Sequence, residues 1–176
     1  SNKESIKIVE ELSKNNHGSD FKWAESIEER NKLWKARHDV YYSVKALGQN
    51  MKVYSTDICV PVSKLVECIS WAEKEVKDKG LIAPMVGHVG DGNFHSIILY
   101  DPNDKEKQKL IREYSDRLID KALELEGTIT GEHGIGLQKK HYLLKEHFDN
   151  LPVMKSIKRS LDPNNIMNPG KVFDLN

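Results

Sequence analysis

One nine-residue run, Gly-His-Val-Gly-Asp-Gly-Asn-Phe-His at 87–95, constrains the fold of this chain more than any other feature. Its central Asp-Gly pair is a strong signal for a two-residue hairpin turn, because both turn positions need positive φ. Such a turn would pair His88 directly with His95 across two antiparallel strands. Directly opposed residues share one face of a sheet, with Cβ atoms about 4.5–5.5 Å apart. The run therefore predicts a hairpin whose two imidazoles could bind one metal ion.

A second glycine-rich run, Gly-Thr-Ile-Thr-Gly-Glu-His-Gly-Ile-Gly at 127–136, adds a carboxylate, Glu132, and a third imidazole, His133. Two histidines and one carboxylate are a common ligand set for a divalent transition metal. Adjacent residues of an extended loop project to opposite sides. We therefore expect Glu132 to complete the metal site and His133 to face a substrate as general base. Two simpler interpretations remain: histidines on a polar sheet face, and a polar loop whose glycines only make turns.

Arg37 is the third candidate for a functional role. It follows Trp34 by three residues and precedes Tyr41 by four, so it lies on their stripe of a predicted helix. A guanidinium at that place could hold a substrate carboxylate through two parallel hydrogen bonds. Alternatively, its stem covers apolar surface while the charged end stays in water.

Apolar periodicity predicts a mixture of helices and strands. We expect helices at 3–14, 27–47, 62–79, 104–126, 137–148 and 151–160, and extended segments at 20–26, 51–60, 81–88 and 93–100. The clearest strand pair is an antiparallel hairpin, which favours an α+β sheet with helices on one face over a doubly wound parallel sheet. The length of 176 residues is consistent with one domain over 1–176.

The composition argues against several classes of partner. Lys and Arg number 27, as do Asp and Glu, so a formal net charge of zero gives no support to nucleic acid as a partner. No apolar run approaches the roughly 18 residues of a membrane-spanning helix. The two cysteines, Cys59 and Cys68, match no zinc or redox spacing. No G-x-G-x-x-G follows a predicted strand, so we expect no dinucleotide site of that kind.

Three motifs in this order resemble the C-terminal domain of FAD-linked D-2-hydroxy-acid dehydrogenases. They are the run at 87–95, Gly-Glu-His-Gly-Ile-Gly at 131–136, and Leu-Asp-Pro-Asn-Asn-Ile-Met-Asn-Pro-Gly-Lys at 161–171. The resemblance extends from about Leu33 to Val172. The family includes D-lactate dehydrogenase (cytochrome), glycolate oxidase and D-2-hydroxyglutarate dehydrogenase, and the segment 55–61 is most similar to the D-lactate branch.

The resemblance implies a ferredoxin-like antiparallel sheet that covers a flavin. It also implies that this domain binds a divalent ion, zinc or manganese. It also implies a role for each of seven residues: metal binding by His88, His95 and Glu132, base catalysis by His133, carboxylate binding by Arg37, and contact with the FAD cofactor by Asn168 and Lys171. Most flavin contacts in this family come from an N-terminal FAD-binding domain outside these 176 residues. We therefore expect the chain to be part of a longer protein and to be inactive alone.

The reaction implied is oxidation of a D-2-hydroxy acid, D-lactate in this branch, with hydride transfer to FAD. The expected partners are the small hydroxy acid, the protein's own FAD domain, and an electron acceptor such as cytochrome c or another flavoprotein. The expected location is the mitochondrion in a eukaryote and the cytoplasm otherwise. D-2-hydroxyglutarate and glycolate are the alternative substrates. Two other classes stay open: a metal-dependent hydrolase, and a non-catalytic module that a metal stabilises.

Overall fold

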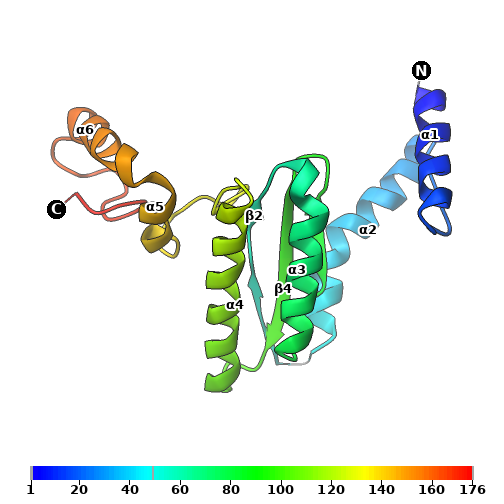
Figure 1. Ribbon diagram of the computed structural model, residues 1–176, viewed down its shortest axis with the longest axis horizontal. Coiled ribbons are helices and arrows are strands. Elements are labelled where there is room, and N and C mark those ends of the chain that lie inside the picture. Colours follow the sequence, from blue (N-terminus) through cyan, green and yellow to red (C-terminus); the bar gives the residue numbers. More distant parts are fainter. Residues whose placement is uncertain (1, 49, 176) are drawn as a thin grey trace. The chain divides into compact units, whose positions relative to one another are not determined.

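A computed structural model describes residues 2–48 and 50–175, and its contacts divide the chain into two compact units, Ser1–Ser43 and Val44–Asn176 (Figure 1). The elements in chain order are α1 (Asn2–Asn15), α2 (Ile27–Ala46), β1 (Lys52–Ser55), β2 (Ile58–Cys59), the 3-10 turn η1 (Val62–Lys64), α3 (Leu65–Asp78), β3 (Met85–His88), β4 (Asn93–Tyr100), α4 (Lys105–Glu124), α5 (Lys140–His147), the 3-10 turn η2 (Phe148–Asn150) and α6 (Leu151–Leu161). None of the helices in the described ranges is long and apolar enough to cross a membrane.

The first unit consists of α1, a connecting segment and most of α2, and it corrects one prediction. The segment 20–26, expected to be a strand, forms none: Asp20 has a positive φ of 55°, outside the extended region. Local contacts hold this segment instead. The rings of Phe21 and Trp23 lie 5.9 Å apart, and Trp23 Nε1 donates to a Glu25 carboxylate oxygen at 3.2 Å. Phe21 and Trp23 alternate with polar residues as in a strand, but among the described residues no strand pairs with this segment, and it forms a loop.

The second unit is built on an antiparallel sheet with β4 as its central strand. The segment that holds β1 and β2 pairs with one side of β4 in a single register, from Lys52 opposite Tyr100 to Cys59 opposite Asn93. The other side of β4 pairs with β3. An isolated antiparallel bridge between Cys59 and Thr128 places the segment around Thr128 beside β2, at the edge of the sheet. The order of these segments is that of a ferredoxin-like βαββαβ fold, so the predicted α+β class is confirmed.

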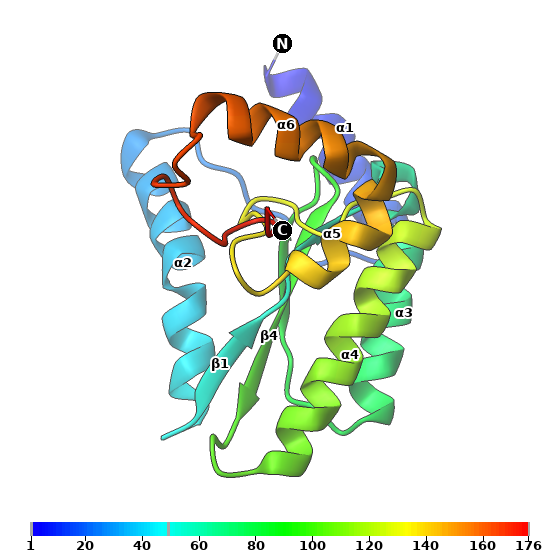
Figure 2. The same ribbon diagram turned by 90° about the vertical axis from the view of Figure 1, so that its left-hand side faces the viewer.

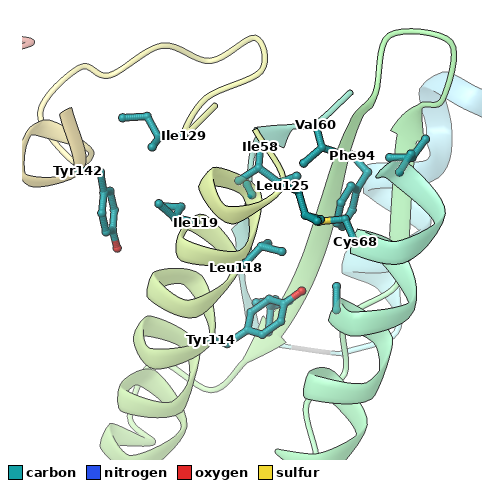
Figure 3. Packing of buried hydrophobic residues seen from close by; sticks show 14 of the residues in the cluster. Ile58, Val60, Cys68, Phe94, Tyr114, Leu118, Ile119, Leu125, Ile129 and Tyr142 are labelled. Carbon is teal, nitrogen blue, oxygen red and sulfur yellow. The ribbon is translucent and has the colours of Figure 1, made fainter. Parts of the chain in front are cut away.

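Alternation along β4 separates the hydrophobic core from the opposite face of the sheet. The even-numbered residues Phe94 and Ile98 are almost completely buried, in the core that α3 and α4 share with the sheet. Figures 1 and 2 show these two helices side by side on one face of the sheet. Figure 3 shows Phe94 and Ile58 within the core, together with Leu118 from α4. The odd-numbered residues of β4 therefore point away from the helices.

The hairpin forms, but its turn differs from the predicted one. A four-residue loop, 89–92, joins the strands, so that His88 lies opposite Asn93 and Val86 lies opposite His95. In this loop Gly92 alone has positive φ, at 77°, whereas the predicted turn needs two such residues. The carbonyl oxygen of Gly92 accepts a hydrogen bond from Val60 N at 3.0 Å. This contact with the residue that follows β2 outweighs the preference of Asp-Gly for a two-residue turn.

The register has moved by two residues, an even number, which preserves the face of every side chain. His88 and His95 therefore remain on one face of the sheet, as diagonal rather than direct neighbours. Diagonal neighbours lie about 7–8 Å apart between Cα atoms, within reach of long or aromatic side chains. The ring centroids of the two histidines lie 6.4 Å apart.

Gly92 provides a test of this loop. A Cβ atom on Gly92 would lie 1.9 Å from the carbonyl oxygen of Val60, and its positive φ disfavours any side chain. We expect Gly92→Ala to lower the free energy of unfolding by about 2–4 kcal/mol, from backbone strain and the clash together. Gly90 is the matched control, because it lies outside the left-handed region and a Cβ there meets no atom within 4 Å. Urea denaturation should show a change below about 0.5 kcal/mol for Gly90→Ala. Equal losses would contradict the observed loop.

Candidate metal centre

His95 projects from the middle of β4 on the sheet face away from α3 and α4, and it is only 7% exposed. Its Nδ1 lies 2.8 Å from the carbonyl oxygen of Thr56. Because a carbonyl oxygen only accepts, Nδ1 carries a proton, and in the neutral ring the lone pair is therefore on Nε2. Nε2 lies 3.0 Å from Glu132 Oε1. The ring is thus fixed in orientation and tautomer as metal-binding histidines usually are.

His88, at the end of β3, approaches the same carboxylate from the other side. Its Nε2 lies 3.6 Å from Glu132 Oε2, so His88 and His95 face different oxygens of the carboxylate. One ligand atom from each of His88, His95 and Glu132 lies within 4.8 Å of the other two. The structure therefore brings the three predicted ligands together, although they come from two strands and a distant loop. Two imidazole nitrogens and a carboxylate oxygen at this spacing fit a divalent transition metal.

The loop that carries Glu132 is held by a buried side chain that sequence reasoning missed, Asp57. Asp57 is 4% exposed, and its carboxylate accepts hydrogen bonds from three consecutive backbone N–H groups. Further donors complete its shell: Thr130 Oγ1 at 2.6 Å, Asn93 Nδ2 at 3.0 Å and Lys139 Nζ at 3.0 Å. The signal available in the sequence was a lone acidic residue directly before the apolar run at 58–60.

The environment of Asp57 keeps its carboxylate charged. Burial by itself raises the pKa of this carboxyl group, but hydrogen bonds from Thr130, the His133 backbone and Lys139, with the positive charge of Lys139, outweigh it. The net result is a pKa well below the usual value for Asp. Asp57, His95 and His133 also lie close enough to form a second group of potential ligands. Asp57 is not a ligand in our account, because N–H and O–H donors already occupy both oxygens.

His133 follows Glu132, and one expectation about this pair is wrong. The two side chains do not diverge: His133 Nε2 lies 3.6 Å from Glu132 Oε1, and its ring centroid lies 5.4 Å from that of His95. The loop is curved rather than extended, because its successive N–H groups all turn toward Asp57. His133 nevertheless differs from the buried His95, since its side chain is 61% exposed. It is the accessible imidazole beside the cluster.

A pocket of about 510 Å³ adjoins His133, and Lys171 is among the residues that line it. The tail that carries Lys171 is fastened to the loop by Val172 N, which donates to the carbonyl oxygen of Gly136 at 2.8 Å. Lys171 Nζ lies 3.4 Å from Asn168 Oδ1, and Asn168 has a positive φ of 47°. The two residues assigned to the flavin by resemblance therefore neighbour each other, and Lys171 lies near His133.

Arg37 belongs to the first unit, on α2, where it is exposed. Its guanidinium carbon lies 5.4 Å from the ring centroid of Trp34. This is a cation–π contact. It agrees with the prediction that the two residues lie on the same face of a helix. A role for Arg37 in substrate binding remains a proposal.

Fold and cluster together define a class of domain: an α+β sheet with helices on one face and a histidine–carboxylate cluster on the other. The family profile described as FAD linked oxidases, C-terminal domain, matches residues 1–172. The chain belongs to this family.

Sequence relatives agree with this assignment, and a solved structure shares the fold. The chain is 48% identical over 174 residues to a probable D-lactate dehydrogenase, mitochondrial, of Danio rerio, covering 98% of this chain and 35% of the relative. It is 40% identical to the D-lactate dehydrogenase [cytochrome], mitochondrial, of Arabidopsis thaliana, covering 97% and 30%. The chain thus spans about a third of these relatives. A 4-ethylphenol oxidase from Gulosibacter chungangensis, in complex with isoeugenol, shares the fold, with a TM-score of 0.56 at 19% identity over 85% of this chain and 31% of the other.

Proposed function

We propose that this chain is the substrate- and metal-binding domain of a flavoprotein that oxidises a D-2-hydroxy acid, D-lactate in the first instance, to the 2-oxo acid. The observation that carries the proposal is the convergence of His88, His95 and Glu132 beside an accessible His133, in a chain of the FAD-linked oxidase family. The relatives named as D-lactate dehydrogenases support the choice of substrate. Their names also support a mitochondrial location and a cytochrome as electron acceptor.

The donor set suits a zinc or manganese ion, held by His88 Nε2, His95 Nε2 and the Glu132 carboxylate. Such an ion would supply Lewis acidity, which lowers the pKa of a substrate hydroxyl. The protein's own contribution is rigidity. The proton on His95 Nδ1 is committed to Thr56, so His95 Nε2 keeps its lone pair in one direction.

His133 is the proposed general base, which accepts the proton of the substrate's α-hydroxyl group. Arg37 would hold the substrate carboxylate and so fix which face of the carbon is presented. Asn168 and Lys171 would contact the flavin from the tail. FAD, bound mainly by another domain of the protein, supplies the hydride acceptor. This domain supplies orientation and charge.

The test is a substrate panel on the complete flavoprotein, mixed without oxygen with D-lactate, L-lactate, glycolate and D-2-hydroxyglutarate. We expect D-lactate to bleach the flavin band near roughly 450 nm fastest and L-lactate to leave it unchanged. The 176-residue chain is the control, expected to be colourless and inactive. Faster bleaching by glycolate or D-2-hydroxyglutarate would move the assignment to another branch of the family. Hydrolysis of an ester by the flavin-free chain would replace it with a metal-dependent hydrolase.

A further inference from the structure

We propose that Asp57 is the positioning residue of the metal centre. Its buried carboxylate bends the backbone at 131–133 into the conformation that places Glu132 between His88 and His95. The inference rests on the proposed function to the extent that it takes these three side chains as the metal ligands. It adds a residue that touches neither metal nor substrate and acts through the loop.

The hydrogen bonds to Asp57 dictate the curvature of this loop. Oδ1 accepts from Gly131 N and Glu132 N, both at 3.1 Å, and Oδ2 accepts from His133 N at 3.0 Å. In an extended chain successive N–H groups alternate in direction. Three consecutive N–H groups can converge on one anion only when the backbone curls around it, as in the anion-binding nests of other proteins. The anion here is a side chain of the same protein.

The charge of Asp57 is balanced within the fold. Lys139 Nζ lies 3.0 Å from Oδ2 and also donates to the carbonyl oxygens of Asp57 and Ile129, at 2.9 and 3.1 Å. Thr130 Oγ1 donates to Oδ2 at 2.6 Å. These donors occupy the carboxylate, and the ammonium group beside it disfavours a second cation there. Asp57 therefore acts as a fixed anchor and not as a fourth ligand.

The neighbouring residue orients the other half of the centre. The register of β1 and β2 along β4, continued through the break at 56–57, places Asp57 opposite His95. Thr56 supplies the carbonyl oxygen that accepts from His95 Nδ1, and Asp57 supplies the carboxylate that holds the Glu132 loop. Two adjacent residues thus position two ligands from distant parts of the chain.

The fit around the anchor is tight. Asn93 Nδ2 donates to Asp57 Oδ1 at 3.0 Å and to the Ile58 carbonyl oxygen at 2.8 Å, so both hydrogens of its amide group are used. A Cβ atom on Gly131 would lie 1.9 Å from that Nδ2 and 2.9 Å from Asp57 Oδ1. Only glycine lets the loop approach the carboxylate this closely. The contact therefore needs the aspartate at position 57 and the glycine at position 131.

The experiment compares Zn²⁺ and Mn²⁺ binding by calorimetry for four variants of the 176-residue chain. Asp57→Asn removes the anion, and Thr130→Val removes one donor while it keeps the branched shape. Thr130→Ser restores the hydroxyl group. Tyr54→Phe is the control, because it removes a partly buried hydrogen bond on the opposite face of the sheet from the metal centre. This bond joins Tyr54 Oη and Ser115 Oγ at 3.0 Å, on the face of β1 that the helices cover. Thermal unfolding is measured for each variant without metal.

We expect Asp57→Asn and Thr130→Val to weaken metal binding by about 10–100-fold, the range for groups that orient metal ligands. Thr130→Ser should stay within about threefold of the original Kd. Tyr54→Phe should lower the unfolding temperature without changing Kd. A purely structural role would give Thr130→Val the behaviour of Tyr54→Phe, with a lower unfolding temperature and an unchanged Kd, and would overturn the inference. Thr130→Val keeps the test decisive if Asp57→Asn does not fold.

Amide hydrogen exchange in the metal-free chain separates this inference from the metal site itself. We expect the N–H groups at 131–133 to exchange at least about tenfold faster in Thr130→Val, and not in Tyr54→Phe. Faster exchange without any metal binding by the original chain would support the anchor and overturn the metal centre. Unchanged exchange together with unchanged Kd would overturn the anchor and leave the metal centre standing.

Discussion

Replacing His133 by alanine in the complete flavoprotein should lower kcat for the hydroxy acid by about 10²–10⁴-fold, the usual effect of losing a general base. The metal should remain bound, because His133 lies outside the group formed by His88, His95 and Glu132. The imidazole is 61% exposed and adjoins a pocket of about 510 Å³, so its loss leaves the fold intact. Stopped-flow flavin reduction measures the rate, and elemental analysis measures the metal.

His88→Ala is the matched control for this prediction. His88 is also an imidazole next to Glu132, but it faces the opposite oxygen of the carboxylate. We expect His88→Ala to lose metal and activity together. The reverse pattern, with metal lost from His133→Ala and kept by His88→Ala, would exchange the two roles. Turnover close to that of the original protein in both variants would remove the mechanism of metal plus base.

Phe94→Ala should lower the free energy of unfolding by about 3–5 kcal/mol, the usual cost of truncating a fully buried aromatic ring. Phe94 is 1% exposed and lies between two site-facing residues of β4, with its ring in the core. Urea denaturation measures the change. Val66→Ala is the control: the side chain on α3 is 77% exposed, and we expect less than about 0.5 kcal/mol.

The same variant tests the division of labour along β4. Folded Phe94→Ala should retain its metal affinity within about tenfold, because the ring points to the helices while His95 points to the opposite face. A small loss of stability, comparable with that of Val66→Ala, would contradict the assignment of the two faces.

The hairpin could be predicted because its information is local. Two histidines seven residues apart around a glycine-rich turn share a face when they lie directly opposite each other. They still share it in any register shifted from that pairing by an even number of residues. The predicted pairing of His88 with His95 was wrong, yet the predicted face was right. What decided the register was Val60, whose N–H group binds the carbonyl oxygen of Gly92. That contact depends on the packing of β2, which the local pattern does not contain.

Asp57 could not be found in the same way, because its partners are distant in the chain. Thr130, His133 and Lys139 lie 73, 76 and 82 residues away. A periodicity argument predicts which face a residue takes but not which loop meets it. The same limit explains the error about Glu132 and His133, whose divergence was inferred from an extended loop. The anchor that curves the loop is tertiary structure.

The segment 20–26 shows the opposite failure, in which local apolar character was overinterpreted. Strand formation needs a neighbouring strand to satisfy the backbone, and propensity alone does not supply one. The long helices were predicted well, because their apolar stripes and caps agree with each other. Asp104, for example, accepts from Lys107 N at the start of α4, as a capping residue should.

The central claim is that His88, His95 and Glu132 bind one divalent ion. Its most direct test is anomalous scattering at the zinc edge from crystals of the zinc-loaded protein, with X-ray absorption of the same sample in solution. The account predicts a single ion, about 2.0–2.2 Å from a nitrogen of each histidine and from a carboxylate oxygen. An ion bound elsewhere, or histidine rings that point away from the carboxylate while zinc is bound, would contradict it.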